Sequence, residues 1–166
     1  MDAIKALGLR ADAHRCLNKG SDNVKQFKRE MIVVLNFGGT YAQTLAKQIR
    51  DIGVYSEIRL GNISAEEIRS LAPKGILLVG EYENAPSYDR AIFDLGIPVL
   101  GIGGGMQLIV QHFGGTVESR SNHDVIKATV TMERETELLK GWQNEDVTLD
   151  VKNVVVAPPK HFTVDA

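Results

Sequence analysis

The order of apolar and polar residues along the chain predicts four buried strands, each followed by a helix. Continuous apolar runs that end at glycine or polar residues are typical of strands in a parallel sheet. Such runs occupy residues 31–37, 75–80 and 97–102, and we also assign a strand to residues 54–60, the segment VYSEIRL. Because these runs do not alternate between apolar and polar residues, we expect both faces of each strand to be covered.

The segment after the first run predicts an amphipathic helix. In "TYAQTLAKQIRDIG", the apolar residues recur at helical spacing: Ala42, Leu45, Ala46, Ile49 and Ile52. Thr40 stands where it can cap the first turn, and Gly53 stands where a helix ends.

Three further helices follow the other runs. In "SAEEIRSLAPKG", Ser64 and Glu67 have the spacing of a capping box, and Pro73 stops the helix. A loop with a short helix is expected from about 87 to 95, and "GGMQLIVQHFGG" predicts a last helix that begins near 103.

This order of elements predicts an α/β fold: a doubly wound, mostly parallel sheet with helices on both faces, of the flavodoxin-like type. After Thr116 the pattern changes to segments with a period of two, rich in β-branched residues. We interpret these segments as an antiparallel C-terminal extension at one edge of the sheet. Residues 31–166 are expected to form one domain.

Composition narrows the functional classes. The chain has 166 residues, of which 43% are hydrophobic and 24% charged, an ordinary composition for a soluble protein. Its net charge of −2 argues against general nucleic-acid binding. No apolar run is long enough to span a membrane, and the N-terminus does not resemble a secretory signal. A single cysteine, Cys16, fits a reducing environment, so we predict a cytoplasmic protein.

The charge is unevenly distributed. Residues 1–30 hold seven Lys or Arg and four Asp or Glu, which gives +3, whereas the remainder carries −5. We interpret residues 1–30 as a basic arm with short helices or partial disorder. Such an arm either stays solvated or docks on a partner or on its own domain.

The stretch "PVLGIGGGMQLI" contains the most distinctive turn. Ligands of doubly wound sheets bind at the carboxyl ends of the strands, and here one strand passes through Gly103, Gly104 and Gly105 directly into a helix. A helix N-terminus attracts anions, and glycines admit a ligand close to the backbone. A small carboxylate or phosphate ligand is one reading of this turn, and a closely packed turn without a ligand is the other.

None of three known motifs is complete at this turn. Gly101 to Gly105 has the spacing of an elbow of the type Gly-x-nucleophile-x-Gly, with glycine at the nucleophile position. The dinucleotide fingerprint fails because Met106 and Leu108 stand where a glycine is needed. The Walker pattern fails as well, since no Gly-Lys-Ser/Thr follows.

Three segments together resemble class I, triad-type glutamine amidotransferases, and most of all the glutaminase domains of GMP synthetases. These segments are "VVLNFGGTYAQTLAKQIRDIGVYSEI", "EEIRSLAPKGILLVG" and "AIFDLGIPVLGIGGGMQLIVQHFGGTVE". The resemblance runs from about Met31 to about Val156. It implies acyl transfer from glutamine by a cysteine that a His–Glu pair activates, with ammonia passed to an ATP-pyrophosphatase domain that aminates XMP.

Carried over by position, the resemblance implies that the catalytic residues are missing. The nucleophile position falls on Gly103, while Gly105, Met106 and Gln107 keep the rest of that motif. Of the Gly-Gly-Pro oxyanion stretch, Gly80 alone survives. The family's Ser-His-Gly-Asp stretch falls at about 151–153 without its histidine, and its His-Pro-Glu segment has no counterpart. Gly80, Gly103, Gly104, Gly105 and Gln107 are therefore the candidate ligand-binding residues, and no catalytic residue is assigned.

No other residue is expected to replace the triad. Cys16 lies in the basic arm, outside the resemblance, and is a weak candidate for a nucleophile. His14, His112, His123 and His161 have no paired spacing with acidic residues that indicates a metal site, and neither a metal nor another cofactor is predicted. The acidic loop of Glu81, Glu83 and Asp89 is expected to be solvated.

Three hypotheses of function follow. In the first, the chain is a non-hydrolysing binding or regulatory subunit, with a synthetase of the ATP-pyrophosphatase type as its partner. In the second, the scaffold serves another biosynthetic reaction, with catalysis supplied by Cys16 or by a partner. In the third, the chain supplies ammonia to GMP synthetase. Neither the ligand nor the oligomeric state follows from the sequence.

Overall fold

A computed structural model of the chain describes residues 30–81, 86–141 and 145–165, with backbone alone for 119–126, 145 and 149–156. The described residues as far as Gly105 form one compact unit, and those from Met106 onward form another. The predicted basic arm lies outside the described residues except for Glu30, and so does Cys16. The predicted boundary between arm and domain stays a prediction.

The first unit is built on a parallel sheet with strand order β2-β1-β3-β4. Its strands are β1 (Met31–Asn36), β2 (Tyr55–Leu60), β3 (Gly75–Gly80) and β4 (Val99–Gly103). Each lies within two residues of the apolar run that predicted it, so the predicted parallel α/β sheet is confirmed.

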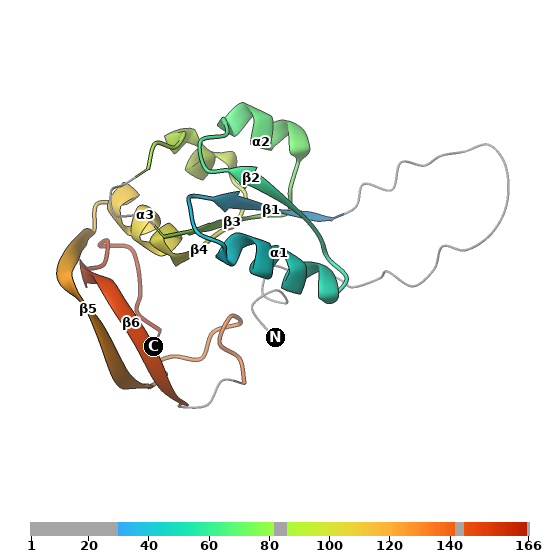
Figure 1. The fold of residues 1–166 in the computed structure, drawn as a ribbon. Helices are drawn as coiled ribbons and strands as arrows, with labels where there is room; N and C mark the ends of the chain where they lie inside the picture. The colour runs from blue at the N-terminus through green and yellow to red at the C-terminus, as the bar shows by residue number, and fades with distance from the viewer. Residues whose placement is uncertain (1–29, 82–85, 142–144, 166) are drawn as a thin grey trace, which may run out of the picture. The chain divides into compact units, whose positions relative to one another are not determined.

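Helices cover both faces of this sheet (Figure 1). The helical elements are α1 (Tyr41–Asp51), α2 (Ala65–Leu71), the 3₁₀ helix η2 (Arg90–Leu95) and α3 (Gly104–His112). The chain moves from β1 outward to β2, and then in the opposite direction through β3 to β4. Because parallel crossovers are right-handed, this reversal places α1 on one face and α2 with η2 on the other.

The core of the first unit lies where β1 and β3 pair between these helix layers. Ile32 to Leu35 in β1 and Ile76 to Val79 in β3 are all buried. Of the five residues whose spacing predicted the apolar face of α1, Ala42, Ala46 and Ile49 are buried, whereas Leu45 and Ile52 are half-buried. On the other side, Ile68 of α2 and Ile92 of η2 are buried.

The helix ends differ in part from the sequence predictions. Ser64 and Glu67 form the predicted capping box at the start of α2. Thr40 occupies the N-cap of α1, but its side chain makes no capping hydrogen bond, so that prediction is wrong. Its backbone is already helical (φ −103°, ψ −7°), whereas a capping side chain needs the extended backbone that Ser64 has. The helix expected at 87–95 is the 3₁₀ helix η2, capped by Asp89.

The second unit contains an antiparallel pair, β5 (Thr116–Val130) and β6 (Glu145–Ala157). The predicted antiparallel extension is therefore confirmed, but among the described residues it forms a two-stranded sheet of its own and does not join the parallel sheet. The register shifts between Ser119 and Asp124, where two predicted segments merge into one irregular strand.

The ends of this unit are held by specific contacts. Pro159 and the carbonyl of Ala157 lie so close to Gly115 that a Cβ there would meet them at 3.0 and 2.7 Å. Arg134 pairs with the Asp165 carboxylate at 2.6 Å and donates to the Thr163 hydroxyl at 2.9 Å. Within the described ranges, no helix has the length and apolar content needed to cross a membrane.

Candidate functional site

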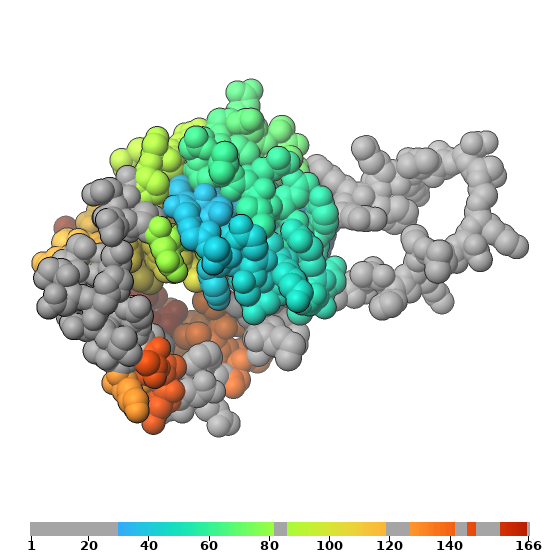
Figure 2. Space-filling model, viewed as in Figure 1, coloured from blue at the N-terminus to red at the C-terminus, as the bar shows by residue number. Residues whose placement is uncertain are grey.

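Three neighbouring strands, β1, β3 and β4, finish side by side at the carboxyl end of the sheet. The chain crossovers reverse direction between β1 and β3. The carboxyl end of the sheet at these two strands is therefore the switch point, where doubly wound sheets bind ligands. Residues 38–41, which follow β1, are exposed, and in the space-filling view the residues after β1 (blue) lie at the surface beside α1 (Figure 2).

Gly103 closes β4 in a left-handed backbone conformation. Its φ is +59°, and residues other than glycine adopt this left-handed conformation at a cost of about 1–2 kcal/mol. The residue is exposed, and it pairs with Gly80 of β3 in the sheet register. A strand that turns sharply into a helix through one strained residue is the backbone of a nucleophile elbow.

There is room for a side chain at Gly103. A Cβ built on this residue would meet the carbonyl oxygen of Gly80 at 3.4 Å, which is an ordinary van der Waals contact. Gly103 therefore has the backbone shape and the space of an elbow position, and as a glycine it carries no side chain there.

Gly105, two residues further on, is a glycine for a different reason. A Cβ at this position would lie 1.8 Å from the carbonyl oxygen of Leu78, deep inside any acceptable contact distance. Gly105 is buried, so the first turn of α3 packs directly on the main chain of β3. This packing by itself explains why residue 105 is a glycine. A ligand contact at Gly105 stays a prediction.

The two other predicted residues of α3 have different surroundings. Gly104 begins the helix and is buried, whereas Gln107 is half-buried one turn further along. The sequence prediction that these two residues bind a ligand remains a prediction.

The loop after β3 lies against the loop after β1. Gly80 is buried, and a Cβ there would meet the Cβ of Phe37 at 2.7 Å. A Cβ on Gly38 would lie 3.0 Å from the Glu81 carbonyl oxygen, and a Cβ on Gly39 would lie 3.7 Å from the Glu81 carboxyl carbon. Glu81, which the sequence analysis assigned to a solvated loop, is exposed but has its side chain over Gly39.

The turn after β1 is held by a hydrogen bond that the sequence analysis did not predict. The Asn36 side chain accepts a hydrogen bond from the Gly38 backbone N–H at 2.9 Å, which fixes the turn after β1. An asparagine two residues before a glycine at a strand end is the signal that would have indicated such a turn.

Two carboxyl groups have a lowered pKa, and both belong to helix caps. The Ser64 hydroxyl and backbone N–H donate to Glu67 and lower its pKa. The backbone N–H groups of Ala65 and Ala91 donate to Asp89 at 2.8 and 3.0 Å and lower its pKa. These contacts stabilise helix ends and do not indicate acid–base catalysis. Among the described residues, no three His, Cys, Asp or Glu side chains gather into a metal site.

The fold and this turn together define an α/β domain of the kind that carries a strand-to-helix elbow. Residues 33–166 match the sequence profile of the family described as glutamine amidotransferase class-I. Because this match covers most of the chain, the protein belongs to the class I glutamine amidotransferase family. The match extends ten residues beyond Val156, the expected end of the resemblance.

Individual relatives give the same assignment. The chain is 46% identical to a candidate glutamine-hydrolysing GMP synthase of Halalkalibacterium halodurans, over 86% of this chain and 29% of that protein. It is 44% identical to the glutamine-hydrolysing GMP synthase of Geobacillus kaustophilus, over 83% of this chain and 28% of that protein. The chain thus spans less than a third of the length of these relatives.

A solved structure supports the fold independently. A protein of Thermoplasma acidophilum, described as a candidate subunit of GMP synthase, superposes with a TM-score of 0.69 at 23% identity. The superposition covers 82% of this chain and 72% of that protein. At this identity the similarity establishes the shared α/β architecture.

Proposed function

We propose that this protein is a glutamine amidotransferase-like domain that does not hydrolyse glutamine and acts as a binding or regulatory unit beside a synthetase. One observation carries the proposal: the elbow backbone is present at Gly103, but the residue has no side chain. Acyl transfer needs a nucleophilic atom at that place, and a main chain offers none.

The expected loss of activity is large. Removal of the nucleophile from a catalytic triad lowers turnover by about 10⁶-fold, and the triad members act as a unit. Binding and an oxyanion hole alone retain about 10³ to 10⁴-fold over the uncatalysed reaction. Glu81, which follows Gly80, puts a carboxylate next to the loop where an oxyanion would need donors.

The same site supports a binding role. The turn at Gly103 is exposed, and Gly80 beside it carries no side chain. We propose that a small carboxylate or phosphate group binds at this turn, near the N-terminus of α3. The relatives named above are synthases, and this chain spans less than a third of their length, which favours a synthetase as the partner of this unit.

A second candidate function is supply of ammonia to a GMP synthetase. The observation in its favour is the 44–46% identity to proteins described as glutamine-hydrolysing GMP synthases. On this alternative, a nucleophile from elsewhere in the chain or from a partner would have to replace the missing one. Cys16 is the one cysteine of the chain.

The two functions are separated by measuring glutamate release from glutamine. We expect the purified protein to show no turnover above background, and Gly103→Cys to stay equally inactive, because a thiol at this turn still needs a general base to activate it. Gly103→Ala controls for the backbone strain that any side chain adds at this φ. Turnover at an enzymatic rate in the unmodified protein, lost in Cys16→Ser, would refute the proposal in favour of ammonia supply.

A further inference from the structure

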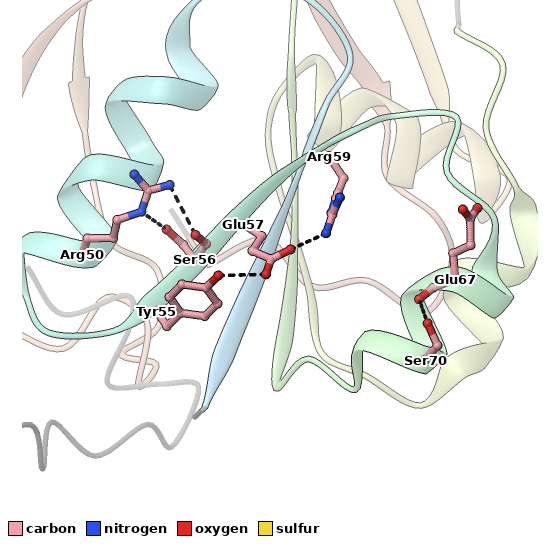
Figure 3. A network of polar contacts seen from close by, with 7 residues as sticks. All are labelled: Arg50, Tyr55, Ser56, Glu57, Arg59, Glu67 and Ser70. Atoms are coloured by element: carbon pink, nitrogen blue, oxygen red, sulfur yellow. Dashed lines mark hydrogen bonds and ion pairs between the residues drawn. The ribbon is translucent and has the colours of Figure 1, made fainter. Parts of the chain in front are cut away.

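Several carboxylates of the first unit have partners that explain their presence. On β2, the Glu57 carboxylate accepts a hydrogen bond from the Tyr55 hydroxyl at 2.8 Å and pairs with Arg59 at 2.5 Å (Figure 3). Glu67 and Asp89 accept hydrogen bonds at helix ends, as described above. These three acidic side chains therefore have structural roles.

Glu81 differs from them, because no described residue donates a hydrogen bond to its carboxylate or forms an ion pair with it. It directly follows Gly80, the last residue of β3. Its Cβ, Cγ and carboxyl carbon all lie 3.7–3.8 Å from the position that a Cβ on Gly39 would occupy. The side chain therefore lies across the turn after β1, and its negative charge stands at the switch point of the sheet.

This charge is near enough to the turn at Gly103 to act on a molecule bound there. Gly39 follows β1 and Gly103 ends β4, and these two strands flank β3 in the sheet. Neighbouring strands are about 4.8 Å apart, so the Glu81 carboxylate and the Gly103 turn are separated by roughly 10 Å. Both belong to the first unit. At about 0.1 M salt the screening length is also about 10 Å, so a ligand at the turn experiences the Glu81 charge.

We infer that Glu81 determines the charge of the ligand at this end of the sheet, and that it selects a molecule with a basic group besides its carboxylate or phosphate. This inference rests on the proposed binding of an anionic group at the Gly103 turn. The basic group pairs with the Glu81 carboxylate, while the anionic group faces the turn. A simple anion would meet the Glu81 charge without compensation and would bind more weakly.

Two probe molecules that differ by a single charged group test this selection. Butyrate and 4-aminobutyrate are carboxylates with the same carbon chain, and the second carries an ammonium group. Titrations at low salt, followed through the Gly103 and Gly39 amide signals in nuclear magnetic resonance spectra, give both dissociation constants. We expect the unmodified protein to prefer 4-aminobutyrate. In Glu81→Gln, butyrate should bind about 2- to 17-fold more tightly, as Coulomb's law gives for roughly 10 Å at effective dielectric constants of about 80 to 20, and 4-aminobutyrate should bind more weakly.

Glu57→Gln is the matched control, because it removes the same charge at a position opposite Val33, within the strands and not at their carboxyl ends. It should leave the ratio of the two dissociation constants unchanged. If both probes bind at Gly103 but Glu81→Gln does not alter their ratio, or alters it no more than Glu57→Gln does, the role of Glu81 is overturned and anion binding at the turn stands. If neither probe shifts the Gly103 signal in any of these proteins, anion binding at the turn is refuted, and the role of Glu81 with it.

Discussion

At the scale of single residues, the glycines of one sequence motif have unrelated roles. The sequence predicted the turn, because strand, glycines and helix follow one another without a gap, and the assignment of the nucleophile position to Gly103 stays a prediction. It did not distinguish Gly103 from Gly105, since the difference depends on what lies across the sheet. A Cβ on Gly103 would make an ordinary van der Waals contact with the Gly80 carbonyl oxygen, whereas a Cβ on Gly105 would overlap the Leu78 carbonyl oxygen.

This difference predicts opposite tolerance to a methyl group. Gly105→Ala should lower the free energy of unfolding by about 3 kcal/mol or more, because the methyl group cannot fit unless α3 moves away from β3. Gly103→Ala should cost about 1–2 kcal/mol, the penalty of a side chain at positive φ. Urea unfolding followed by circular dichroism measures both values. Equal losses in the two variants would contradict the close packing of α3 on β3.

At the scale of elements, the sequence predicted which helices and strands are present better than it predicted how each of them begins and ends. The capping box of α2 could be predicted because Ser64 and Glu67 are three residues apart and act locally. The role of Asp89 could not, because one of its two partners, Ala65, is 24 residues away in the chain. Asp89 caps η2 and also bonds the first N–H of α2, so one carboxylate joins the two helical elements on the same face of the sheet.

Protonation of Asp89 should therefore weaken the fold at acidic pH. Its pKa is lowered in the folded state, so the stabilisation is present above the unfolded-state pKa and is lost as pH falls through the folded-state value, below about pH 4. In Asp89→Asn the melting temperature should be lower at pH 7 and should fall less steeply between pH 5 and pH 3. Thermal denaturation at several pH values measures this.

The conservative variant Glu67→Gln provides the comparison for Asp89→Asn. The pKa of Glu67 is lowered in the same direction, but its partner is the nearby Ser64, so its loss affects the start of α2 alone. A pH profile of Asp89→Asn that matches the unmodified protein would show that the Asp89 contacts do not contribute to stability.

At the scale of the whole molecule, the α/β class and the parallel sheet followed from hydrophobic patterning. The four apolar runs and their short crossovers leave few arrangements that obey the right-handed rule. The division near Gly105 and Met106 did not follow from the sequence, because α3 reads as one uninterrupted helix. Likewise, a period of two indicated strand segments within 116–157 but not that the strands would form a sheet of their own.

The two sheets should differ in their local stability. The central strands β1 and β3 are almost wholly buried, and each pairs on both sides, whereas β5 and β6 pair with each other alone in the described chain. Hydrogen exchange followed by mass spectrometry should show the slowest amides in peptides 31–36 and 75–80. Exchange from 127–130 as slow as from these peptides would show that the antiparallel pair has a further, stabilising partner.

The contact between Gly105 and the Leu78 carbonyl has a consequence for recognition. Because main chain rests on main chain at Gly105, this residue has no space to shift toward β3, and we expect the backbone of the turn to be fixed before a ligand binds. A guest molecule would then lose little affinity to ordering its host, and its rate of association would not wait for a rearrangement.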